Sequence, residues 1–216
     1  RFGKIRPPFV NSGMIEEANS LFFDRSYIGD DWERYDLGAQ LTGRVGVLRG
    51  WLAAQNGNDN GGNQHALTLR GMWDVVGGGA ERNYEGAWNA PDGLSLSVGG
   101  AIYYDTDTDD QSAQAIEGML TFNRLYVAAE YADNGDGLGS LYSWGVTSSF
   151  MATEDLEVAA RLEDFDRDDK ADLYRAGVNY YVRGHDIKWQ IAYSSSDSNA
   201  PLASAQVLLL GLTVSF

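Results

Sequence analysis

The chain has 216 residues and a formal net charge of −15, from 31 Asp and Glu against 16 Lys and Arg. This acidic balance argues against a nucleic-acid partner, which requires a basic surface. The absence of Cys excludes a disulfide framework and thiolate chemistry. No run of about 18 consecutive apolar residues occurs, so the sequence predicts no transmembrane helix.

Bulky apolar residues alternate with small or polar residues along most of the chain. In "ALTLRGMWDV", for example, Leu67, Leu69 and Trp73 alternate with Thr68 and Arg70. This period of two predicts β-strands, about 12 in all, and each is near the ~10 residues with which a tilted strand crosses a bilayer. In chain order, we expect them at 1–6, 35–43, 46–55, 65–75, 94–104, 113–123, 124–133, 139–150, 155–164, 171–182, 186–196 and 204–216.

The connections between these strands alternate in length. Acidic or Gly-rich stretches such as 56–65 and 105–112 alternate with tight junctions such as Asn123–Arg124. Barrels of the outer membrane have long loops on one side and short turns on the other. We therefore expect one all-β domain over 1–216, an antiparallel transmembrane β-barrel, with a soluble β-sandwich as an alternative. The segment 76–93 is an exception, because its composition predicts a long loop on the short-turn side.

Charges of both signs fall on the small-residue face, which we take as the interior. A wall with both signs holds water and excludes a packed apolar core. Across a pore it favours ion selectivity, and the alternative is that these charges pair with one another and only keep the interior polar. Acidic residues expected to point inward are Asp36, Asp74, Glu117, Glu130, Glu157 and Glu163, and Arg124 is expected there too. The residues predicted to line the pore are Lys4, Arg6, Arg49, Arg70, Arg161, Arg175 and Lys188.

Two acidic loops raise the question of a metal site. "DTDTDD" (105–110) and "DFDRDDKAD" (164–172) place carboxylates at alternate positions, as a hard cation such as Ca²⁺ requires. Both loops lack the Gly at the sixth position and the Glu at the twelfth that an EF-hand has. Solvated acidic loops are therefore the prediction, with weak Ca²⁺ binding as the alternative and no other cofactor or metal expected.

No catalytic constellation stands out in the sequence. There is no set of nucleophile and base, and no phosphate-binding glycine loop of the expected form. His65 and His185 lie in predicted connections, where we expect them to be solvated turn residues. The sequence does not predict an enzyme.

Three stretches near the N-terminus carry a resemblance to a known family. "RFGKIRPPF" (1–9), "LFFDRS" (21–26) and "DLGAQLTGRV" (36–45) resemble, in order and spacing, the phosphate-selective porins of the O and P type from Gram-negative outer membranes. The resemblance implies a trimeric porin of about 16 strands, located in the outer membrane, with inward-folding loops that constrict the pore. It also implies that the terminal Phe216 is read by the barrel-assembly machinery. Because this chain has about 12 predicted strands, we expect that N-terminal strands are missing from it.

The resemblance also sets the expected function and partners. A passive-diffusion porin for small hydrophilic solutes or ions is the leading hypothesis, with the lipid bilayer, lipopolysaccharide and two further copies of the chain as partners. The family's basic ladder for phosphate has no residue-by-residue match here, so a general or anion-leaning pore is expected. The alternative is a structural barrel that anchors an envelope or surface assembly.

Overall fold

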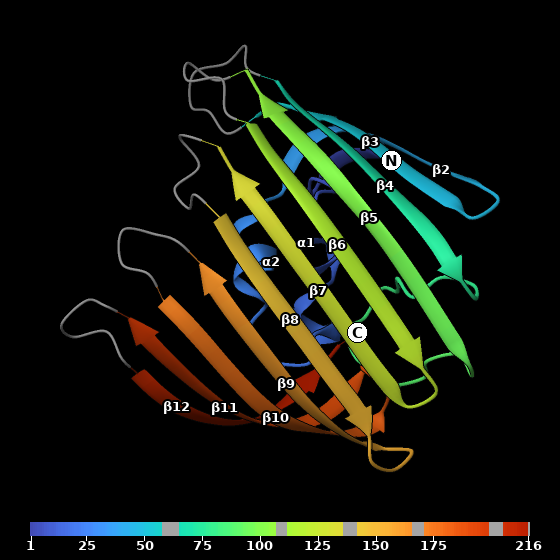
Figure 1. Ribbon diagram of the computed structural model, residues 1–216. Coiled ribbons are helices and arrows are strands. Elements are labelled where there is room, and N and C mark those ends of the chain that lie inside the picture. The colour runs from blue at the N-terminus through green and yellow to red at the C-terminus, as the bar shows by residue number, and fades with distance from the viewer. Residues whose placement is uncertain (58–64, 107–111, 136–141, 166–170, 199–204, 216) are drawn as a thin grey trace.

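The structure is a computed structural model that describes residues 1–57, 65–106, 112–135, 142–165, 171–198 and 205–215. Within these residues, twelve antiparallel strands form one sheet in which each strand pairs with its sequence neighbours (Figure 1). They agree with the predicted ranges to within a few residues at each end. The strands are β1 (Phe2–Ile5), β2 (Asp36–Val45), β3 (Leu48–Gln55), β4 (Ala66–Val76), β5 (Leu94–Asp105), β6 (Ser112–Phe122), β7 (Leu125–Asn134), β8 (Tyr142–Met151), β9 (Leu156–Phe165), β10 (Ala171–Arg183), β11 (Ile187–Ser198) and β12 (Ala205–Val214).

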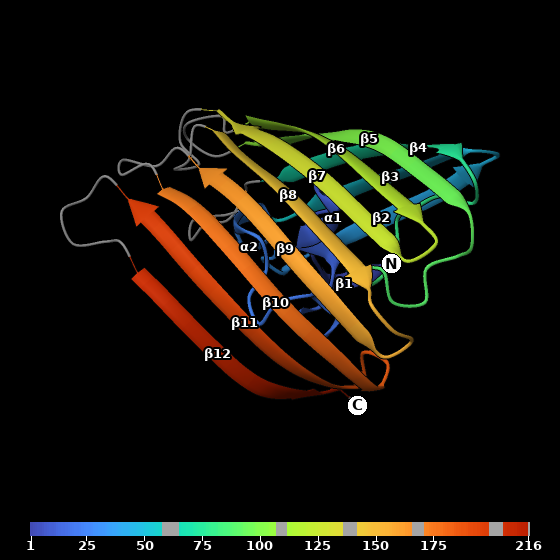
Figure 2. The same ribbon diagram turned by 60° about the horizontal axis from the view of Figure 1, so that its bottom comes forward.

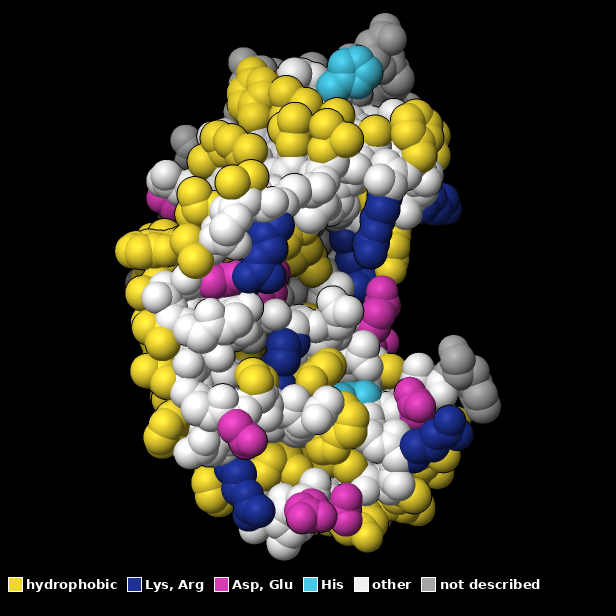
Figure 3. Space-filling view, turned by 90° about the vertical axis from the view of Figure 1, so that its right-hand side faces the viewer, with side chains coloured by type: hydrophobic (Ala, Val, Ile, Leu, Met, Phe, Trp, Pro, Cys, Tyr) yellow, Lys and Arg dark blue, Asp and Glu magenta, His cyan; other side chains and the backbone are white. Residues whose placement is uncertain are grey.

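Side chains alternate between the two faces of this sheet, as the sequence pattern predicts. In β4, the side chains of Leu69 and Trp73 are 53% and 50% exposed, whereas Arg70 and Asp74 are 0% and 2% exposed. Large apolar side chains therefore cover the outer face, and small or charged ones cover the inner face. Figure 3 shows apolar side chains along the outer edge of the molecule and charged ones around its hollow.

Two-residue turns join β2 to β3 and β6 to β7. Gly46 (φ 59°) and Asn123 (φ 52°) take the left-handed conformation that such hairpin turns require. Arg124, which we expected to point inward, is instead exposed in the second of these turns, because a turn residue lies outside the alternation of the strands.

Two connecting segments fold against the inner face of the sheet, and together we call them the plug. The first is 6–35, which contains the short helices α1 (Asn11–Met14), η1 (Glu17–Asn19) and α2 (Tyr27–Asp31). The second is 77–93, the segment that composition placed on the short-turn side. Figures 1 and 2 show α1 and α2 in the concavity of the sheet. No helix within the described ranges is long and apolar enough to cross a membrane.

Apolar side chains of the plug pack against small residues of the wall. Phe9 stacks on Trp32 with 3.8 Å between ring centroids, and the pair packs against Tyr103 and alanines of β4 to β7. Leu21 and Phe22 pack in a second cluster that includes methionines of the wall. These contacts fix the plug against the inner face, where it occupies the concavity of the curved sheet.

The first and last strands of the sheet, β1 and β12, are not joined to each other by any pairing among the described residues. The sheet nevertheless curves as a barrel wall does, and Figure 2 shows its concave side occupied by the plug. Among the described residues, the antiparallel sheet therefore has two edge strands, β1 and β12. We call the opening between these two strands the seam.

Candidate functional site

The structure brings most of the predicted pore-lining residues to the inner face. Arg70, Arg161 and Lys188 are buried, and Arg6, Arg49 and Arg175 are half-buried. Lys4 is exposed on β1, and its cross-strand partner is Leu37, an exposed apolar residue of β2. Five of the seven predicted side chains, Arg49, Arg70, Arg161, Arg175 and Lys188, therefore contact the plug from the wall. Arg6 belongs to the plug itself, where it pairs with Glu16, and Lys4 lies opposite Leu37 away from the plug.

One network of ion pairs lies between β3, β4 and β6. Arg49 Nη2 is 2.6 Å from Asp74 Oδ1, and its Nη1 pairs with Glu81 of the plug. Arg70 Nη1 is 2.6 Å from Glu81 Oε1, and its Nε is 2.5 Å from Glu117 Oε1. Because Glu81 joins both arginines, the network ties the segment 77–93 to the wall.

A second network lies between β9, β10 and both parts of the plug. Arg161 Nη2 is 2.6 Å from both carboxylate oxygens of Glu85. Arg175 Nη1 is 3.7 Å from Glu163 Oε2 and donates to the carbonyl oxygen of Arg25 at 2.6 Å. Basic wall side chains are thus neutralised by carboxylates or used to hold plug carbonyls.

Lys188 is a basic wall side chain that holds a carbonyl group of the plug. Its ammonium group is buried and donates to the carbonyl oxygen of Ser20 in the plug. The ring nitrogen Nδ1 of His185 lies 3.4 Å from the same ammonium group. Lys188 therefore positions the plug rather than presenting a free charge to a solute.

Wall glutamates accept backbone N–H groups of the plug, a contact that sequence reasoning did not anticipate. Asn11 N and Ser12 N, in the first turn of α1, donate to Glu117 Oε2 and Glu130 Oε1, each at 2.9 Å. Tyr27 N, the first residue of α2, donates to Glu163 Oε1 at 2.6 Å. First-turn amides have no partner within their own helix, so these carboxylates satisfy donors that would otherwise be buried without one.

The segment 77–93 is held in the same way and is also joined to 6–35. Ala87 N donates to Glu157 of β9 and to Ser149 Oγ of β8. Glu85 accepts from Leu21 N at 3.0 Å through Oε2, and its own backbone N donates to Asn19 O at 2.9 Å. Glu85 therefore links the two parts of the plug to each other and, through Arg161, to the wall.

Aromatic rings hold the plug at the end of the sheet where β10 turns into β11. Trp88 lies 5.7 Å from Tyr181 and 5.4 Å from His185, measured between ring centroids. Gly184 (φ 53°) lies under the Trp88 ring, where a Cβ would be 2.6 Å from the nearest ring atom. Only glycine allows both this backbone conformation and this close approach.

His185 is buried, so the expectation that it is a solvated turn residue is wrong. The rings of Tyr84, Trp88 and Tyr181 surround it, and Lys188 lies beside it. Burial and then the charge of Lys188 lower the pKa of His185 to about 3. The imidazole is therefore neutral at physiological pH.

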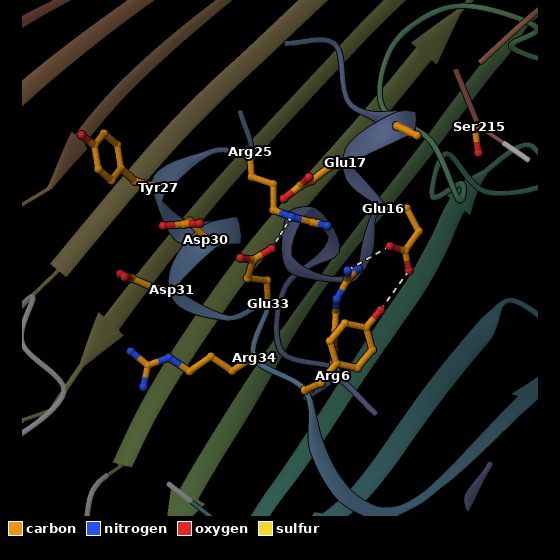
Figure 4. A pocket seen from close by; sticks show the side chains of 12 residues that line it. Arg6, Glu16, Glu17, Arg25, Tyr27, Asp30, Asp31, Glu33, Arg34 and Ser215 are labelled. Carbon is orange, nitrogen blue, oxygen red and sulfur yellow. Dashed lines mark hydrogen bonds and ion pairs between the residues drawn. The ribbon is translucent and has the colours of Figure 1, made fainter. Parts of the chain in front are cut away.

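A polar cavity of about 880 Å³ lies on the side of 6–35 that faces the seam. Arg6, which follows β1, and Ser215, which follows β12, both line it, so both edges of the sheet reach this cavity. Figure 4 shows its carboxylates and guanidinium groups, with Arg6 paired to Glu16. The cavity shows that the plug leaves polar space within the concavity.

The acidic loops that raised the question of Ca²⁺ are only partly described. Asp107, Asp109 and Asp110 of the first, and Asp166, Asp168 and Asp169 of the second, lie outside the described residues. Within the described ranges, no group of three or more His, Asp or Glu side chains could hold a metal ion. Solvated acidic loops stay the prediction, with weak Ca²⁺ binding as the alternative.

No family model and no curated protein sequence matches the chain. Among solved structures, it is similar to the outer membrane channel DcaP of Acinetobacter baumannii, with 10% sequence identity and a TM-score of 0.55, over 98% of this chain and 68% of that one. It is also similar to the KdgM porin, with 10% identity and a TM-score of 0.41, over 84% of this chain and 92% of that one. The likeness to DcaP concerns the fold, and it confirms the predicted antiparallel barrel architecture. The phosphate-selective porin family stays a prediction.

Proposed function

We propose that the chain is a non-enzymatic channel of the outer membrane, through which small hydrophilic solutes or ions diffuse passively. The observation that carries this proposal is the division of the sheet into an apolar outer face and a charged inner face. A closed sheet satisfies every backbone group in lipid, and a polar interior lets solutes cross. The fold shared with an outer membrane channel supports the same conclusion.

The selectivity of the channel is part of the proposal. The basic wall residues favour anions, and this preference is what the resemblance to phosphate-selective porins implies. Arg49, Arg70 and Arg161 are, however, all paired with carboxylates. We therefore expect a small anion preference rather than a phosphate-specific pore. Assembly as a homotrimer and contact with lipopolysaccharide complete the proposal.

Reconstitution of the detergent-purified chain in a planar bilayer tests the function. Discrete current steps are expected from the full chain, and larger steps from a variant in which residues 79–92 are deleted so that Gly78 is joined to Gly93. The proposal fails if the full chain gives no such steps, or if the chain is monodisperse in buffer without detergent.

A structural barrel that anchors an envelope or surface assembly is the second candidate. The plug favours it, because two anchored segments occupy much of the concavity. A sealed barrel of this kind would insert into the bilayer without current, so the same recording separates the two candidates.

A further inference from the structure

The polar cavity on the seam side of the segment 6–35 is lined by charged side chains of both signs. Its volume of about 880 Å³ falls within the range of roughly 300–1,000 Å³ that small-molecule sites occupy. The lining contains the guanidinium groups of Arg6, Arg25 and Arg34 and a larger number of carboxylates. A solute that enters this cavity therefore meets both kinds of charge.

Two of the three guanidinium groups belong to ion pairs within the lining. Arg25 Nε is 2.7 Å from Glu33 Oε2, and Arg6 Nη2 is 2.9 Å from Glu16 Oε2 (Figure 4). Arg6 also donates through Nη1 to the carbonyl oxygen of Ile15 at 3.2 Å. Each of these pairs is neutral as a whole and helps to shape the segment. The other charges of the lining are therefore the ones that a solute senses.

Three further charged side chains of the lining are exposed to the cavity and its solvent. Glu17 belongs to η1, Asp30 belongs to α2, and Arg34 lies between α2 and β2. Within the described ranges, no hydrogen bond or ion pair is found for the carboxylates of Glu17 and Asp30. The guanidinium group of Arg34 has five N–H donors, which is more than one partner uses. These three side chains can therefore bind a solute.

The local sequence explains why α2 presents charge to the cavity. In "YIGDDW" (27–32), Ile28 and Trp32 are four positions apart, so they share one face of the helix, and both are buried in the cluster against the wall. Asp30 lies two positions from each of them and thus on the opposite face. The Ser26 hydroxyl caps the helix by accepting from Gly29 N at 3.0 Å. The helix is therefore held in place without the carboxylate of Asp30.

The chemistry of these groups indicates which solutes they suit. A carboxylate accepts hydrogen bonds from an ammonium group, and a guanidinium group donates to a carboxylate. A purely anionic solute meets the surplus carboxylates, whereas a purely cationic solute places its charge beside Arg34. A solute with one group of each sign can pair with Glu17 or Asp30 and with Arg34 at once. Such pairing also replaces the water that each charged group gives up on entering the cavity.

We propose that the cavity binds small zwitterionic solutes, which carry an ammonium group and a carboxylate, and that Glu17, Asp30 and Arg34 select them. This inference rests on the proposed channel function. The two plug carboxylates bind the ammonium group, and Arg34 binds the carboxylate of the solute. The site concerns organic solutes and is separate from the small-ion preference expected from the wall.

Glycine and glycolamide test the proposal, because they are isomers of nearly the same size and only glycine is a zwitterion at about pH 7. Liposomes that contain the full chain are transferred into isotonic solutions of each compound, and their swelling rate measures entry. The rate of protein-free liposomes is subtracted. The ratio of the glycine rate to the glycolamide rate should exceed one, by up to about fivefold, as one exposed ion pair allows.

Variants of the cavity identify the source of this ratio. Glu17→Gln/Asp30→Asn removes the acceptors for the ammonium group, and Arg34→Gln removes the donor for the carboxylate. Each variant should bring the ratio close to one, and the exposed positions of these residues leave the contacts between plug and wall in place. Asp24→Asn is the matched control, because Asp24 is an exposed carboxylate of the same segment that does not line the cavity. It should keep the original ratio.

The outcomes separate the solute site from the channel function. Swelling in both solutes with a ratio of one or less overturns the zwitterion site and leaves the channel function intact. A ratio above one that the cavity variants do not lower, or that Asp24→Asn lowers equally, also overturns the site. No swelling in either solute overturns it as well, and if the planar bilayer then shows no current, the channel function fails with it.

Discussion

Glu117 and Glu130 lie directly opposite each other on β6 and β7, and the neighbouring amides of Asn11 and Ser12 donate to them, one each, at 2.9 Å. Like charges at opposed positions of an antiparallel pair are destabilising unless something compensates them. Here the compensation comes from the first turn of α1 and from Arg70. The register of two wall strands therefore determines where the plug begins its first helix.

Removal of one member of this pair should destabilise the fold. Glu117→Ala leaves the fully buried Arg70 with Glu81 as its remaining carboxylate and leaves Asn11 N without its acceptor. Breaking a buried ion pair typically costs about 3 kcal/mol or more. Urea unfolding in detergent should show a loss of that size, whereas Glu154→Ala, on an exposed turn, should change little. Equal stability of the two variants would contradict the role given to Glu117.

A single charged substitution tests whether the outer face of the sheet is embedded in lipid. Ile116 is 64% exposed in β6, so Arg at this position would meet lipid if the outer face is embedded. A cost of about 2–4 kcal/mol is expected near the bilayer midplane. The matched variant Val47→Arg, in the β2–β3 turn, should cost much less. A negligible effect of Ile116→Arg on stability in bilayers would argue for an outer face in water.

The contact between Gly184 and Trp88 predicts that alanine costs more stability at Gly184 than at Gly46, although both glycines have the same left-handed backbone conformation. Gly46→Ala (φ 59°, with open space around the Cβ position) should cost about 1 kcal/mol from the left-handed backbone alone. Gly184→Ala (φ 53°) should cost about 1–3 kcal/mol more, because its Cβ would overlap the Trp88 ring. Thermal unfolding of both variants measures the difference. Similar losses would mean that Trp88 does not pack on Gly184.

The buried imidazole predicts a pH dependence of stability. Because the folded-state pKa of His185 is about 3, below its ordinary value of about 6.5, the neutral form is favoured in the fold. Its contribution is fully present above about pH 6.5 and is lost as the pH falls toward 3, at no more than roughly 1.4 kcal/mol per pH unit. His185→Gln should remove this part of the pH dependence. Parallel stability curves for the two proteins between about pH 6 and pH 4 would refute it.

The selectivity proposal rests on a side chain that still reaches solvent. Arg49 is 15% exposed and pairs with Asp74 and Glu81, so Arg49→Glu places three carboxylates together on the inner face. The reversal potential in a salt gradient should shift toward cations, and Arg49→Lys should restore most of the original value. An unchanged reversal potential removes Arg49 from the selectivity of the channel.

The sequence by itself determined the strands and the face on which most strand side chains lie, although Lys4 and Arg124 are exceptions. Strand alternation is a local property with a period of two, so Leu69 outside and Arg70 inside follow from position alone. The same pattern indicated inward positions for Glu117, Glu130, Glu157 and Glu163. The sequence left open whether the interior charges pair with one another. Arg49, Arg70 and Arg161 each form an ion pair with a carboxylate.

Only the tertiary structure decided what those inward charges hold. Their partners include backbone N–H groups, which every residue except proline carries and no sequence pattern marks. Asn11 and Glu117 are 106 positions apart, and Ala87 and Glu157 are 70 apart. The burial of His185 differs from the sequence-based expectation for a related reason, since a turn residue becomes buried only when a distant segment, here Trp88 and Tyr84, packs over it. Local sequence specifies the wall, and long-range packing of segments without periodicity specifies the plug.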